Sequence, residues 1–199
     1  MGREVTIIEP EHDADDTDGF FPKGPASVCV EGPPQRQCST APKEFGNSPT
    51  VAIVQLRKDM PAILFSAASG GVSGFQIHLA LLRPRAGKDL EDFLGPGISV
   101  SNQGQYAFWN ESAVSDAQIF VTAEYVWGPN ESHYGEHRYM ISAYISRRVG
   151  IDGDLYYLED RYMTAHKYDL DANADVLVSE KQEILSRLRR LQQETQFKK

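Results

Sequence analysis

Hydrophobic residues between residues 50 and 168 recur mainly at every second position, which is the spacing of half-buried β-strands. Segment 75–82 (FQIHLALL) is the clearest case, with apolar residues at alternate positions. The apolar runs 51–56 (VAIVQL) and 62–67 (AILFSA) flank a short polar connection, and 98–109 (ISVSNQGQYAFW) also has an extended pattern. These segments predict successive strands joined by turns.

A β-hairpin is predicted immediately after them. Segments 117–127 (AQIFVTAEYVW) and 137–145 (HRYMISAYI) each place alternate apolar residues on one face, and GPNESHYGE between them is a loop sequence. An Asp152-Gly153 turn then leads into a long strand predicted over 155–168. One face of that strand should carry Tyr156, Leu158, Asp160, Tyr162, Thr164, His166 and Tyr168.

The pattern changes to a helical period at the end of the chain. Residues 179–194 (SEKQEILSRLRRLQQE) predict a C-terminal helix, for which Ser179 and Gln182 can form a capping box. We expect its apolar stripe to pack on the sheet. The alternative is a stripe that pairs with a partner helix, as in a structural subunit that assembles through it. The stripe consists of Ile184, Leu185, Leu188 and Leu191.

These elements predict a mainly β fold, an antiparallel β-sandwich or open barrel of about seven or eight strands with one C-terminal α-helix. The 199 residues fit a single domain, which we place at 25–199. Residues 1–24 contain seven acidic and two basic residues, and we expect this segment to be disordered.

The net charge limits the partners of the chain. A formal charge of −8 argues against nucleic-acid binding and against electrostatic attachment to anionic membranes. No apolar run approaches the roughly 20 residues of a spanning helix, so no transmembrane segment is expected.

The only two cysteines, Cys29 and Cys38, flank a Gly-Pro-Pro turn in CVEGPPQRQC. This spacing favours a disulfide and hence an oxidising compartment, so that the protein would be secreted or periplasmic. Two free thiols in a cytosolic protein are the alternative. Residues 1–13 lack the apolar centre of a secretory signal, so either the signal is absent from this chain or the compartment prediction is wrong.

A candidate calcium loop lies at 169–180 (DLDANADVLVSE). Asp169, Asp171, Asn173, Asp175 and Glu180 occupy positions 1, 3, 5, 7 and 12, the spacing of oxygen ligands around calcium. Ala174 stands where such loops usually have a glycine. The alternative is a set of polar turns whose acidic groups complement the start of the helix.

A second metal-like pattern, HYGEH at 133–137, matches the letters of a zinc peptidase. That chemistry requires both histidines on one face of a helix. Gly135 and the predicted hairpin loop contradict this requirement, so we interpret the segment as a solvated loop in which His133 and His137 at most bind metal adventitiously.

Function is the least determined property of the sequence. We expect a non-enzymatic binding domain for a protein or glycan ligand, and Trp109 and Trp127 are candidates for its contact face. The alternative is a hydrolase of carbohydrate or a related polymer that uses a carboxylate pair drawn from Asp160, Glu159 or Glu124.

Overall fold

The computed structural model describes residues 3–12, 22–33, 35–70, 74, 76–85, 89–95, 98–101, 103–132, 135–149, 153–169 and 175–196. The chain divides into two compact units, Met1–Asn102 and Gln103–Lys199. The sequence predicts one domain over 25–199, because no change of composition marks the position where the units divide. Each unit is described by itself.

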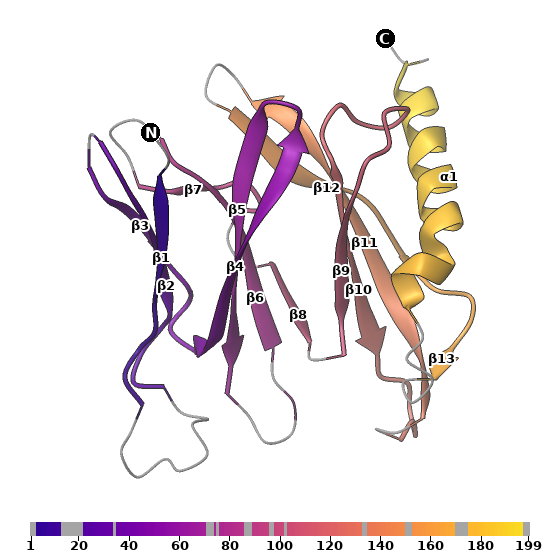
Figure 1. The fold of residues 1–199 in the computed structure, drawn as a ribbon. Coiled ribbons are helices and arrows are strands. Elements are labelled where there is room, and N and C mark those ends of the chain that lie inside the picture. Colours follow the sequence, from indigo (N-terminus) through magenta and orange to yellow (C-terminus); the bar gives the residue numbers. More distant parts are fainter. Residues whose placement is uncertain are drawn as a thin grey trace. The chain divides into compact units, whose positions relative to one another are not determined.

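The first unit contains two antiparallel sheets (Figure 1). One has the order β1-β2-β3, and the other has the order β4-β5-β6-β7 with β8 also paired to β6. The expected strands 51–56, 62–67 and 75–82 are confirmed as parts of β4, β5 and β6. The strands are β1 Glu4–Ile8, β2 Ser27–Glu31, β3 Gln37–Thr40, β4 Phe45–Arg57, β5 Met60–Ser69, β6 Gln76–Arg83, β7 Glu91–Asp92 and β8 Ile98–Ser101.

The two sheets of this unit share one hydrophobic core, so the unit has the layered packing of a β-sandwich. Phe65 and Leu82 are fully buried at its centre. The other buried members come from both sheets and their connections: Ala26, Val28, Val30, Ala41, Phe45, Ile63, Ala67, Ala80 and Leu90.

The predicted disulfide is confirmed. Cys29 of β2 and Cys38 of β3 lie directly opposite each other in the register, and their sulfur atoms are 2.06 Å apart. The expectation of disorder over 1–24 is wrong for Glu4–Ile8, which form β1 and pair with β2. Val5 packs against the core from this strand, and that short apolar contact outweighs the acidic surroundings. Residues 13–21 lie outside the described part of the chain.

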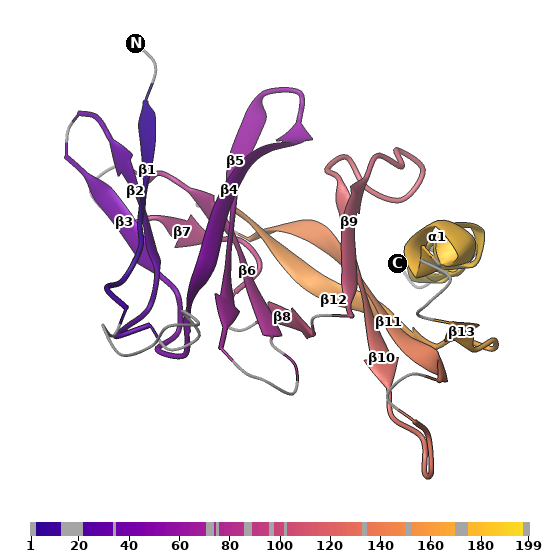
Figure 2. The ribbon, with the colours of Figure 1, turned by 60° about the horizontal axis from the view of Figure 1, so that its bottom comes forward.

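The second unit is one antiparallel sheet with a helix along one face (Figures 1 and 2). Its order is β12-β11-β10-β9, and β13 also pairs with β11. The predicted hairpin is confirmed as β10 and β11, which pair from Phe120↔Tyr144 to Val126↔Arg138. The elements are β9 Gln105–Trp109, β10 Ile119–Val126, β11 Glu136–Val149, β12 Gly153–Met163, β13 Tyr168–Asp169 and α1 Val176–Gln196.

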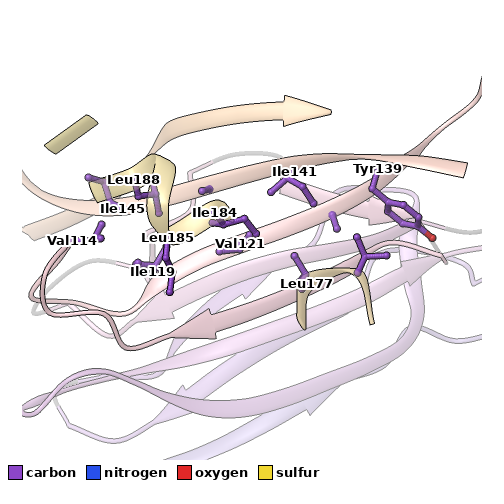
Figure 3. Packing of buried hydrophobic residues seen from close by; sticks show 13 residues of the cluster. Val114, Ile119, Val121, Tyr139, Ile141, Ile145, Leu177, Ile184, Leu185 and Leu188 are labelled. Carbon is purple, nitrogen blue, oxygen red and sulfur yellow. The ribbon is translucent and has the colours of Figure 1, made fainter. Parts of the chain in front are cut away.

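The helix stripe packs on the sheet as predicted (Figure 3). Ile184 and Leu188 are buried against Ile119, Val121 and Ile141. Ile184, Leu185 and Leu188 of the stripe are therefore covered within the chain, and Leu191 is half-buried. The helix begins three residues earlier than predicted, and Asp175 rather than Ser179 provides its N-cap.

The predicted single face of strand 155–168 is wrong because the strand is interrupted twice. Asp160 pairs with Ala143 whereas Leu158 pairs with Tyr144, so Glu159 is an extra residue that turns the side chains before it to the opposite face. The strand then ends at Met163; Thr164 still hydrogen-bonds to Tyr139 of β11, and strand pairing with β11 resumes at β13.

The fold class is confirmed: the chain is mainly β, with three antiparallel sheets and one C-terminal helix. None of these sheets closes into a barrel within the described residues. The described part of the chain contains 13 strands rather than the expected seven or eight, since several are only two to five residues long.

Candidate functional site: a groove between β9 and α1

Strand β9 forms one edge of the sheet in the second unit. Among the described residues it pairs with β10 alone, from Ile119↔Trp109 to Ala123↔Gln105. On the sheet face away from α1, the ring of Phe108 lies 4.9 Å from that of Phe120, which anchors the strand. A strand at a sheet edge presents backbone N–H and C=O groups that a further strand can pair with.

A groove of about 450 Å³ lies along this edge. Its wall on the sheet side consists of β9 and the residue before it, and its other wall is the beginning of α1. Val178 is 66% exposed, so apolar surface on the helix wall faces solvent. The lining residues are Gly104, Gln105, Tyr106, Ala107, Trp109, Asp175, Leu177 and Val178.

Hydrogen bonds join the two walls and cap the helix. The N–H of Leu177 donates to Oε1 of Gln105 at 3.1 Å, and the N–H of Val178 donates to Oδ1 of Asp175 at 3.0 Å. The carbonyl of Asp175 accepts hydrogen bonds from the N–H and the hydroxyl of Ser179. Two of the first amides of α1, those of Leu177 and Val178, are thus satisfied by side chains.

Two charged contacts link α1 to the far end of β9 and the residues after it. The Nζ of Lys181 lies 5.1 Å from the centre of the Trp109 ring, a cation–π contact. Arg189 forms an ion pair with Glu111 at 3.0 Å. The groove therefore has a carboxylate at the start of the helix and an ammonium group beside its tryptophan.

A buried carboxylate fixes the helix on the sheet. Oε2 of Glu180 accepts a hydrogen bond from Tyr162 at 2.8 Å, and Oε1 accepts one from Tyr168 at 2.6 Å. Burial, and then the hydrogen bond and charge of Glu180, raise the pKa of both tyrosines, so they remain protonated donors. The guanidinium of Arg187 stacks on Tyr162 at 4.5 Å and pairs with Asp160 at 2.6 Å.

The predicted calcium residues have separate roles where the structure describes them. Asp169 lies in β13, Asp175 caps α1, and both oxygens of Glu180 are occupied by tyrosines. A calcium ion held by both oxygens of Glu180 would have to displace these hydroxyl groups. Asp171 and Asn173 lie outside the described residues, so calcium binding stays a prediction.

Of the carboxylates named for the hydrolase alternative, Asp160 and Glu159 form contacts that stabilise the fold. Asp160 is paired with Arg187, and Glu159 accepts hydrogen bonds from Arg147 and Gln192. Glu124 lies on β10 opposite Met140. The contacts of Asp160 and Glu159 join β12 to α1 and to β11, and they lend no support to a catalytic pair.

His137 of the HYGEH pattern is fully buried in β11. Its Nδ1 lies 3.0 Å from Oε2 of Glu131, and the same carboxylate pairs with Lys167 at 2.6 Å and accepts the N–H of Gly128 at 2.7 Å. The hydrogen bonds from Lys167, Gly128 and His137, in that order, lower the pKa of Glu131 to about 2. The histidine therefore closes the end of the hairpin, and His133 lies outside the described residues.

Of the two candidate tryptophans, Trp109 belongs to the groove and Trp127 does not. Trp127 is 49% exposed and packs edge-on against His137. Sequence reasoning missed Gln105 and Val178, because neither residue belongs to a recognisable motif. The exposed valine next to the buried Leu177 was the one available signal, since it breaks the amphipathic pattern of the helix.

Among the described residues no group of three or more His, Cys, Asp or Glu side chains is placed to hold a metal ion. No helix in the described part of the chain is long and apolar enough to cross a membrane. No family model, no curated protein and no solved structure matches the chain.

Proposed function

We propose that the protein is a binding domain that takes up an extended peptide segment of a partner protein in the groove between β9 and α1. The peptide adds to the sheet as a strand next to β9. The observation that carries the proposal is that an edge strand and an exposed apolar helix turn line one groove. Strand addition beside a helix is a recurrent mode of peptide recognition.

The dimensions of the groove suit a short peptide. β9 has five residues, which at ~3.3 Å per residue gives an edge of roughly 17 Å. Main-chain hydrogen bonds to this edge would supply affinity, and alternate side chains of the peptide would lie between the sheet and α1. Ala107 leaves space there, because its neighbours on the same strand face are the larger Gln105 and Trp109.

A peptide ligand accounts for the groove better than a glycan, which is the other ligand class expected from the sequence. Sugars use aromatic faces and hydroxyl hydrogen bonds, but they do not match the regular alternation of N–H and C=O groups along an edge strand as a peptide backbone does. The face of Trp109 is also occupied by Lys181. We therefore expect a peptide with an apolar residue for the Ala107–Val178 region and an acidic residue near Lys181.

The compartment proposal follows from the disulfide. A cross-strand disulfide between Cys29 and Cys38 persists under oxidising conditions, which supports a secreted or periplasmic location. A structural calcium at Asp169–Glu180 is a separate prediction. Calcium calorimetry on EDTA-stripped protein tests it, because a ligand at 100 times its dissociation constant adds about 2.7 kcal/mol of stability.

Selection of peptides tests the binding proposal. A displayed library of random dodecapeptides is selected on the purified full chain, and the affinity of each enriched peptide is measured by fluorescence anisotropy. Val178→Arg places a long charged side chain over the exposed helix turn and should weaken binding at least tenfold. Ser186→Arg adds the same side chain at an exposed position of α1 that does not line the groove, and it should bind normally.

Equal affinity of the two variants, or no enriched peptide at all, would contradict the proposal. Circular dichroism of both variants shows whether the helix is retained, and both positions are exposed on α1, so neither substitution disturbs the core.

A further inference from the structure

The first unit contains a second concave site, distinct from the groove. A pocket of about 260 Å³ lies between the two sheets that form the sandwich. Its floor is apolar, with Phe65 and Ala80 buried in the core. Its polar groups come from three strands, β3, β6 and β7. The lining residues are Ser39, Thr40, Ala41, Pro42, Phe65, His78, Ala80 and Asp92.

Asp92 is held in this pocket by the backbone. Its Oδ1 accepts the N–H of Leu81 and the N–H of Leu94, both at 2.9 Å. These two bonds fix the carboxyl group without neutralising it, because amides carry no net charge. Burial outweighs them and raises the pKa of Asp92 to about 6, so the group is largely ionised at pH 7 and partly protonated below that.

The neighbouring cations are engaged elsewhere. Glu91, the residue before Asp92 in β7, pairs with Arg85 at 2.5 Å and lies 3.9 Å from Arg83. No lysine, arginine or histidine among the described residues forms an ion pair with Asp92. A half-buried carboxylate without a counter-ion is costly, and a bound cation would reduce that cost.

His78 does not supply the missing positive charge. It is buried against the ring of Phe45 at 5.3 Å, and burial lowers its pKa, with the charge of Glu44 acting weakly in the opposite direction. The imidazole is therefore neutral at pH 7 and can accept or donate one hydrogen bond. Ser39 and Thr40 add hydroxyl groups at the mouth, where Thr40 is exposed.

We propose that this pocket binds a small organic ammonium ion, with Asp92 as its counter-ion, the Phe65 side of the pocket in contact with its carbon chain, and His78 and Ser39 available for hydrogen bonds. The site is separate from the peptide groove and does not depend on it. The ligand class follows from three features together: one carboxylate that has no ion-pair partner among the described residues, apolar walls, and a volume that admits only a small molecule.

A charge series of equal-sized probes tests this inference. n-Butylammonium, n-butanol and butyrate are titrated into the ¹⁵N-labelled full chain at pH 7.5, and the amide resonances of Leu81 and Leu94 report on Asp92 directly. n-Butylammonium should shift both resonances saturably, and the neutral and anionic probes should not. At pH 5 the ammonium should bind more weakly, because Asp92 is then mostly protonated.

Asp92→Asn is the matched variant, since its amide oxygen can still accept the two backbone bonds. It should bind n-butylammonium about ten- to a hundredfold more weakly, the range for loss of a charge-assisted hydrogen bond. Asp89→Asn removes the same charge from an exposed residue nearby and should bind normally. Unchanged amide resonances of β1 and β2 in the free Asp92→Asn protein confirm its fold, because these strands are not hydrogen-bonded to Asp92.

Three results would overturn the inference. One is no saturable shift with n-butylammonium, another is equal binding of n-butanol, and the third is equal affinity of wild type and a folded Asp92→Asn protein. If Asp92→Asn loses its fold, the comparison of n-butylammonium with n-butanol on the wild-type chain decides the question alone.

Discussion

The ammonium group of Lys181 lies 5.1 Å from the centre of the Trp109 ring, so a residue of α1 rests on the last residue of the edge strand β9. Residues 105 and 177 form a second link between the same two elements, through the hydrogen bond from the Leu177 amide to the Gln105 side chain. The spacing between α1 and the edge strand is therefore held at two points, and the groove lies between them.

Lys181→Gln should lower stability by about 0.5–1 kcal/mol, the range for an exposed cation–π contact. Gln has nearly the same helix propensity as Lys, so the helix itself is not weakened. The measurement is the urea midpoint of unfolding. Arg190→Gln removes a positive charge from an exposed position of the same helix and should leave the midpoint unchanged. Identical midpoints for the two variants would show that the Trp109 contact contributes nothing.

Glu180→Ala should destabilise the chain by about 2–4 kcal/mol, because the hydroxyls of Tyr162 and Tyr168 lose their acceptor beneath the helix. Glu183→Ala is the control: this residue is exposed on the same helix, 3.9 Å from Arg187, and its loss should cost less than about 0.5 kcal/mol. Urea denaturation followed by circular dichroism compares them. A cost for Glu180→Ala as small as that of the control would show that the tyrosine pair is not a support of α1.

Replacing both Cys29 and Cys38 by alanine should cost about 2–3 kcal/mol, since the disulfide closes a loop with a sequence separation of 9 residues. Reducing agent should destabilise the wild-type chain by a similar amount and leave the double variant unchanged. Chemical denaturation with and without dithiothreitol makes the comparison. A wild-type chain that is insensitive to dithiothreitol, and heavier than the disulfide form by about two hydrogens, would mean that the bridge is absent.

Asp92 predicts a pH dependence of stability. Its pKa is about 6 in the folded chain against an ordinary value of 3.8, so the folded state binds more protons than the unfolded state between these values. The contribution of this group to stability is therefore largest below about pH 4 and is lost as the pH rises through about 6. Its size is on the order of 3 kcal/mol, because one pKa unit corresponds to about 1.4 kcal/mol.

Asp92→Asn should remove this component, while Asp89→Asn should keep the wild-type profile. Urea denaturation at several pH values between about 4 and 7 gives the free energy of unfolding of the three proteins as a function of pH. The change of each protein's stability with pH is the quantity of interest, because other groups also titrate. Parallel stability–pH profiles for Asp92→Asn and the wild type would show that burial does not raise the pKa of Asp92.

Much of the fold was predictable from periodicity. The β10–β11 hairpin and the α1 stripe follow from residues such as Ile119, Ile141 and Ile184, whose spacing matches the face that the structure buries. The Cys29–Cys38 bridge was predictable because two cysteines flank a turn, which places them opposite each other in a hairpin. In each case local spacing alone determines the contact.

The features that escaped prediction depend on pairing between distant segments. The extra residue Glu159 reverses the faces of β12, and only the register with β11 reveals it. The division after Asn102 follows from which strands pair, not from composition. The groove and the pocket are similar cases, because Gln105 meets Leu177 and Asp92 meets Leu81 only through the topology of the sheets.

Amide hydrogen exchange of residues 105–109, measured with and without a peptide selected from the library, tests the central claim most directly. We predict that the outward amides of residues 106–109 exchange rapidly in the free chain, because these residues pair only with β10 among the described strands, and slow at least tenfold when the peptide binds. The amides of β10, already paired on both sides, should change little. Protection that appears elsewhere while β9 continues to exchange rapidly would contradict strand addition at this edge.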